Sequence, residues 1–81
     1  MVTLINLVKD GNLIRTDYYG EGETNDLGHI VYDISADKVV EKVYSKSESD
    51  TWYWYFAKAV IAIKRLVEHN KFPSTYHFIW Y

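Results

Sequence analysis

The stretch that decides the fold runs from Asp50 to Asn70 and reads DTWYWYFAKAVIAIKRLVEHN. At about 100° per residue, its large apolar side chains fall within one arc of roughly 160°, which predicts a helix with one buried face. The predicted buried stripe consists of Trp52, Tyr55, Phe56, Ala59, Val60, Ala62, Ile63, Leu66 and Val67. Trp54 and Ile61 project nearly opposite the centre of that stripe, with Ala57 beside them. We therefore expect a small second apolar patch on the outer face of the helix.

Both ends of this helix carry residues that favour a helix terminus. Ser49 or Asp50 is the expected N-cap, because a side-chain oxygen there can accept a hydrogen bond from a first-turn amide. Glu48 adds negative charge at the positive end of the helix dipole. At the other end Asn70 tolerates the left-handed conformation of a C-cap, and Pro73 favours extended backbone in the residue before it. The helix should end near Asn70.

The segments around the helix are rich in strand-forming residues. The expected strands cover residues 2–9, 12–19, 29–34, 38–44 and 75–81. The order is therefore ββββαβ, with one long helix packed across one face of an antiparallel sheet of four or five strands, which is an α+β fold in a single domain spanning residues 1–81. The last strand should lie antiparallel beside the first strand or parallel beside the fourth.

The first two strands are expected to form a hairpin around Asp10-Gly11, a dipeptide typical of a two-residue type I′ turn. That turn fixes a register in which Leu4 faces Asp17. In the second hairpin we expect Ile34 to pair with Val39, and this register places Val43 in the core. These registers leave apolar residues on the open face of the sheet: Val2, Leu4, Val8, Leu13, Tyr19, Val31, Val40, Tyr44, Ile79 and Tyr81.

An open face of this kind has a functional implication. One helix covers only one side of a sheet, and contiguous apolar surface usually marks an interaction site. We expect either the open face or the patch of Trp54 and Ile61 to contact another protein. A second copy of the chain is the expected partner, because symmetric dimers are the commonest assembly and a small domain gains most from one.

The composition excludes several other classes. The chain has 81 residues, a net charge of −2 and no cysteine, so it has neither a disulfide framework nor a thiolate metal site. Its N-terminal residues do not resemble a signal peptide, and no apolar run approaches about 18 residues. We therefore expect a cytoplasmic protein that is not embedded in a membrane. The scattered lysines and arginines do not form the basic patch that nucleic-acid binding requires.

Catalytic and metal-binding patterns are weak. His29, His77 and either Asp17 or Asp33 could form a metal site if the strands brought them together, but isolated histidines on strands are usually surface residues. The acidic loop at residues 20–28 does not have the ligand order of a calcium loop, and no serine has a nucleophile-elbow context. We expect no enzyme activity, no cofactor and no metal.

The function expected from the sequence is a noncatalytic protein-interaction domain that forms a homodimer, as a small regulator or inhibitor. The candidate binding residues are Arg15, Tyr19, His29, Val31, Tyr44, Trp54, Ile61, His77 and Tyr81. The alternative is a module that binds a small ligand or single-stranded nucleic acid on an aromatic sheet face. Its stacking residues would be Tyr18, Tyr19, Tyr44, Trp80 and Tyr81.

Overall fold

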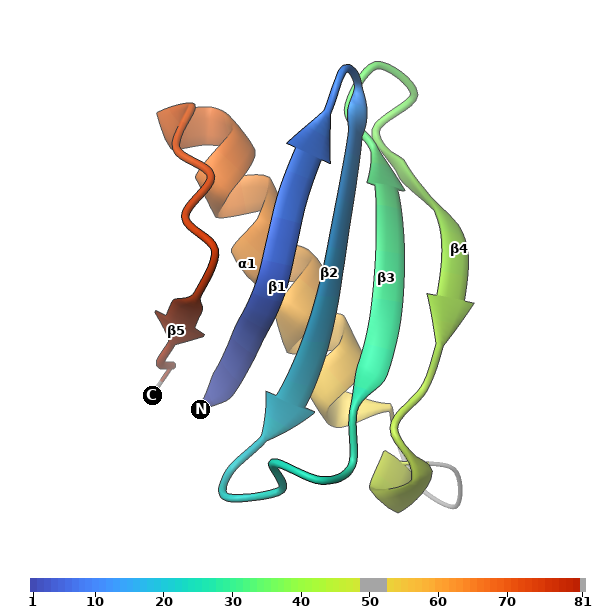
Figure 1. The fold of residues 1–81 in the computed structure, drawn as a ribbon, viewed down its shortest axis with the longest axis vertical. Coiled ribbons are helices and arrows are strands. Elements are labelled where there is room, and N and C mark those ends of the chain that lie inside the picture. The colour runs from blue at the N-terminus through green and yellow to red at the C-terminus, as the bar shows by residue number, and fades with distance from the viewer. Residues whose placement is uncertain (49–52, 81) are drawn as a thin grey trace.

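The computed structural model describes residues 1–48 and 53–80. Its elements are β1 (Val2–Asp10), β2 (Leu13–Gly20), β3 (Gly28–Asp33), β4 (Lys38–Val43), the short 3₁₀ helix η1 (Lys46–Glu48), α1 (Trp54–His69) and β5 (Tyr76–Phe78). The strands form one antiparallel sheet in the order β4-β3-β2-β1-β5, and α1 crosses one face of it (Figure 1). The predicted α+β fold is confirmed. β5 takes the antiparallel position beside β1, one of the two positions that the sequence allowed.

The first hairpin turns one residue later than predicted. Asp10 pairs with Leu13, so the central residues of the turn are Gly11 and Asn12 instead of Asp10 and Gly11. Gly11 has a φ of 60°, and glycine at the first central position is the requirement of a type II′ turn. The register predicted from the type I′ turn is therefore wrong.

A β-bulge in β1 reverses part of the predicted face assignment. The register shifts between Ile5 and Val8, where Asn6 has a φ of 54°. The extra residue inverts the inward and outward alternation on the N-terminal side of the bulge. As a result, Val2 and Leu4 share the buried face with Leu7 instead of lying on the open face. The predicted faces of β2 are correct, because Ile14, Thr16 and Tyr18 are buried beneath the helix side of the sheet.

A second bulge lies in β4. Val39 pairs with Tyr32 and Glu41 pairs with Val31, which leaves Val40 as the extra residue. The predicted pairing of Ile34 with Val39 is therefore wrong. Because Val43 pairs with His29, it lies on the open face and is 56% exposed, in contrast to its predicted place in the core.

The helix begins later than the sequence predicted and ends where expected. Tyr53 precedes α1 in the left-handed conformation, with a φ of 52°, and its side chain makes no capping hydrogen bond. The expected caps Ser49 and Asp50 lie outside the described residues. At the C-terminus Asn70 is left-handed, as predicted, and its amide donates to the carbonyl oxygens of the last turn.

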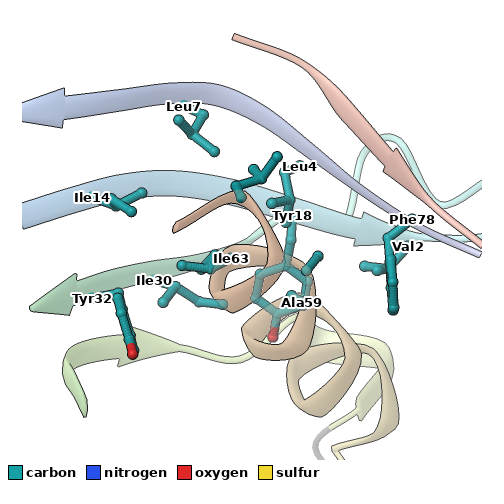
Figure 2. Close-up of a cluster of buried hydrophobic side chains, with 12 residues drawn as sticks. Val2, Leu4, Leu7, Ile14, Tyr18, Ile30, Tyr32, Ala59, Ile63 and Phe78 are labelled. Carbon is teal, nitrogen blue, oxygen red and sulfur yellow. The ribbon is translucent and has the colours of Figure 1, made fainter. Parts of the chain in front are cut away.

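The core fills the space between α1 and the sheet (Figure 2). It consists of Val2, Leu4, Leu7, Ile14, Tyr18, Ile30, Tyr32, Ala59, Ala62, Ile63, Leu66 and Phe78. Two glycines in the sheet allow aromatic rings to lie directly on the backbone. A Cβ atom at Gly28 would come within 2.2 Å of the Tyr18 ring, and one at Gly20 within 2.4 Å of the Tyr55 ring. Both rings can therefore pack this closely only because glycine has no side chain.

Candidate functional site

The sheet face opposite α1 is more polar than the sequence predicted. The register sets Thr3 between His77 and Tyr19, and sets Asp17 between Ile5 and His29. The next row on this face is Arg15, Val31 and Glu41. The structure thus places five of the predicted binding residues on the open face: Arg15, Tyr19, His29, Val31 and His77. Charged groups separate the apolar side chains, so the face is not a continuous apolar surface.

A hydrogen-bonded network crosses three strands of this face. His29 Nδ1 lies 2.9 Å from Asp17 Oδ1, and Asn6 Nδ2 donates to Asp17 Oδ2 at 3.0 Å. Because an ionised carboxylate only accepts hydrogen bonds, this geometry selects a histidine that carries a proton on Nδ1. The left-handed backbone of Asn6 at the bulge brings its amide to Asp17. The network joins β1, β2 and β3 through the Asp17 carboxylate.

His77 lies apart from this network. Its Nδ1 atom is 3.0 Å from the Thr3 hydroxyl on the neighbouring strand. β1 and β2 separate the strand of His77 from that of His29, a separation of roughly 14 Å at ordinary strand spacing. Within residues 1–48 and 53–80, no group of three or more histidine or acidic side chains is close enough to hold a metal ion. The cluster considered from the sequence does not form.

Among the described residues, the aromatic rings do not gather on the open face. Tyr18 lies in the core, and Tyr44 packs beside the start of α1, stacked on Tyr53 at 4.1 Å and edge-on to Phe56 at 5.0 Å between ring centroids. The predicted place of Tyr44 on the open face is therefore wrong. Trp80 contacts Trp54, and Tyr81 lies outside the described residues. Of the five expected stacking residues, the structure places only Tyr19 on this face among those it describes.

The outer face of α1 carries the second predicted patch. Trp54 is 51% exposed and Ile61 is 40% exposed, about two helical turns apart on the same side. Lys58 lies between two rings, with its Nζ atom 4.8 Å from the centroid of Trp54 and 5.2 Å from that of Trp80. The exposed apolar patch expected from the sequence is present on this face, and Lys58 makes cation–π contacts with Trp54 and Trp80 there.

A buried carboxylate joins the sheet to the beginning of α1. Glu48 is 2% exposed and accepts hydrogen bonds from the hydroxyl of Tyr18 at 2.7 Å, the hydroxyl of Ser45 at 2.6 Å and the amide of Phe56 at 2.6 Å. The amide of Ser45 donates to the Tyr18 oxygen at 3.3 Å. Burial and the bond to Glu48 raise the pKa of the Tyr18 hydroxyl. These hydrogen bonds hold Tyr18, Ser45 and the Phe56 amide around the Glu48 carboxylate.

Only part of this cluster is predictable from the sequence. Glu48 is expected near the positive end of the helix dipole, but its bonds to Tyr18 and Ser45 are not expected. The run Ser45-Lys46-Ser47-Glu48 matches the S-x-x-E pattern of a capping box, which was the available signal. In the structure Ser45 donates to Glu48 within this run, while the second carboxylate oxygen reaches forward to the next helix.

The turn between β3 and β4 is held by two acidic side chains. The Ala36 amide and the Ser35 hydroxyl donate to Asp33 and hold the pKa of this carboxyl below its usual range. The Tyr32 hydroxyl donates to Asp37, and burial together with that acceptor raises the pKa of Tyr32 to about 12. The Nζ atom of Lys64 on α1 lies 3.9 Å from Oδ1 of Asp37, so this turn also contacts the helix.

Comparisons with family models, with curated proteins and with solved structures find no match for this chain. Within residues 1–48 and 53–80, no helix is both long enough and apolar enough to span a membrane.

Proposed function

We propose that this chain is a noncatalytic protein-interaction domain of the cytoplasm that associates with a second copy of itself through the outer face of α1. The observation that carries the proposal is the exposure of Trp54 and Ile61 on one side of the helix. Tryptophan is among the residues most enriched at the energetic centres of interfaces. A half-exposed tryptophan beside an exposed isoleucine is the kind of apolar surface that a partner would cover.

The surroundings of these two residues favour helix pairing. Ala57 lies between them and is small enough to let a second helix approach closely. Lys58, Arg65 and Glu68 surround the patch with charged groups, as the polar rim of an interface does. If two copies of α1 cross antiparallel at Ile61, Trp54 of each copy lies near Arg65 and Glu68 of the other. Both signs of charge on one helix make the face suitable for pairing with itself.

The open sheet face supports association less well than the outer helix face. Asn6 and His29 already pair with Asp17 across three of its strands, and the charged side chains of Arg15 and Glu41 interrupt its apolar residues. Antiparallel sheets commonly leave one such face in water. The helix patch therefore takes precedence over the open face.

Sedimentation velocity over a range of protein concentrations tests the proposal. The wild type should form dimers, and Trp54→Glu and Ile61→Glu should each remain monomeric. A carboxylate at position 54 would lie in the first helical turn, where the positive end of the helix dipole stabilises it. Trp54→Glu should therefore not unfold α1, and unfolding of the helix would not explain a loss of dimers. Circular dichroism should confirm that the helix content is retained.

Val43→Glu is the matched control, because Val43 is also exposed but lies on the sheet face opposite α1. This variant should dimerise like the wild type. Wild-type protein that stays monomeric at its highest soluble concentration would overturn the proposal. Dimers that persist in both helix variants but dissociate in Val43→Glu would move the interface to the sheet.

A further inference from the structure

The buried carboxylate of Glu48 is bonded to the first turn of α1, the turn that also carries Trp54 of the proposed association face. One of its oxygens accepts the hydrogen bond from the Phe56 amide, and Phe56 is in the first turn of α1 together with Trp54. The other oxygen accepts from Tyr18 on β2 and from Ser45 after β4. A single side chain thus ties the first helical turn to two other parts of the fold.

This tie replaces an ordinary helix cap. Tyr53 is in the left-handed conformation and its side chain makes no capping hydrogen bond. The first-turn amides of a helix need acceptors, and the positive end of the helix dipole favours a negative group. Glu48 supplies both an acceptor and a charge from outside the helix, at a position shielded from solvent.

The rings around Glu48 extend the connection to the surface. Phe56 contacts Tyr44 edge-on, and Tyr44 stacks on Tyr53, the residue before Trp54. Lys42 on β4 lies over the rings of both Tyr44 and Phe56, at 5.4 Å and 5.7 Å. The exposed end of α1 is therefore packed on a cluster whose polar centre is the Glu48 carboxylate.

We propose that Glu48 is a positioning residue for self-association, which holds the first turn of α1 so that Trp54 keeps a fixed place on the same helix face as Ile61. This inference rests on the proposed function. Neutralising the carboxylate loosens the first turn, and Trp54 loses its fixed place relative to Ile61. Ile61 lies further along the helix and keeps its position.

Glu48→Gln tests the inference, because the amide preserves the shape of the side chain and removes its charge. The dimer dissociation constant should rise by about tenfold or more, because molecules whose first turn is loosened must reorder it before they can associate. Amide hydrogen exchange measured by NMR should become faster at Phe56 and remain slow at Leu66. The indole N–H signal of Trp54, identified by its absence in Trp54→Phe, should shift.

A stability-matched control separates positioning from general weakening. Ile63→Val and Leu66→Ala shorten buried side chains further along α1, and the one whose melting temperature matches that of Glu48→Gln is compared with it. The control should dimerise as tightly as the wild type. Equal weakening in the control and in Glu48→Gln would overturn the inference, as would a protected Phe56 amide in Glu48→Gln.

The inference and the proposed function fail in different ways. A monomeric wild type removes the proposed function, and the exchange at Phe56 and the Trp54 indole signal then still decide whether Glu48 holds the first turn. A wild-type dimer that Glu48→Gln leaves unchanged removes the inference alone.

Discussion

Tyr18→Phe should destabilise the protein through the loss of one buried hydroxyl. Tyr18 is fully buried, and its hydroxyl donates to the Glu48 carboxylate and accepts from the Ser45 amide. Phenylalanine keeps the ring contacts, so the substitution creates no large cavity. A hydrogen bond to a charged group contributes about 1.5–3 kcal/mol, and an unsatisfied buried amide adds about 1–3 kcal/mol. Because the Ser45 bond is long, we expect a total loss of about 2–4 kcal/mol.

This loss is large for a chain of 81 residues. At roughly 0.05–0.15 kcal/mol per residue, the whole domain is stable by about 4–12 kcal/mol. Urea denaturation at neutral pH should show a lower midpoint with an unchanged m-value, because the exposed area on unfolding is the same. Tyr19→Phe, on the open sheet face, is the control. A loss below about 0.5 kcal/mol, the size of an ordinary surface substitution, would refute the role assigned to the hydroxyl.

Substitutions at three further positions test other parts of the fold. Gly28→Ala should cost about 1–3 kcal/mol because its Cβ meets the Tyr18 ring, and this cost should shrink in a Tyr18→Ala background as judged by urea denaturation. Asn6→Ala should be less stable than Asn6→Gly by about 1 kcal/mol, because both lose the bond to Asp17 but only alanine resists the left-handed backbone; equal midpoints would contradict the strain at this bulge. Tyr32→Phe should reduce the loss of stability at alkaline pH. The pKa of Tyr32 is raised from 10.0 to about 12, so between these pH values the unfolded chain releases a proton that the folded chain keeps. The free energy of unfolding therefore falls by up to about 1.4 kcal/mol per pH unit because of this group. The free energy of unfolding is measured by urea denaturation at several pH values in this range. If it falls with pH as steeply in Tyr32→Phe as in the wild type, Tyr32 is not the source of the alkaline instability.

The elements of the fold could be predicted because their signals are local. The 3.6-residue period of the helix, the strand-forming runs and the cap at Asn70 each depend on neighbouring residues. The ββββαβ order follows from these elements, and it limits the last strand to two positions. The exposure of Trp54 and Ile61 also follows directly from the helical period.

The register of β1 could not be predicted because it depends on a bulge. Asp10-Gly11 and Gly11-Asn12 both satisfy the chemistry of a two-residue turn, and the structure uses the second. Asparagine tolerates positive φ, but nothing near Asn6 in the sequence requires it there. The bulge is explained only by the folded sheet, in which it buries both Leu4 and Leu7 and brings Asn6 to Asp17. One extra residue moved Val2 and Leu4 from the predicted open face into the core.

The Glu48 cluster could not be predicted from the sequence for a different reason. Its members come from β2, from the segment after β4 and from α1, so their contacts require the complete tertiary structure. A sequence pattern can show that Ser45 and Glu48 are spaced for capping. It cannot show that Tyr18, far along the chain, completes the carboxylate's hydrogen bonds.

The free edge of the sheet explains why association is better assigned to the helix. β4 is the longer of the two edge strands, and an exposed edge is a template for pairing with another chain. Lys38 and Lys42 place charge along this edge, and the bulge at Val40 interrupts its regular pairing geometry. Both features oppose strand addition. On the outer face of α1, Trp54 remains 51% exposed beside Lys58 and Trp80, and Ile61 remains 40% exposed. That exposure is the physical reason for proposing the helix as the self-association surface.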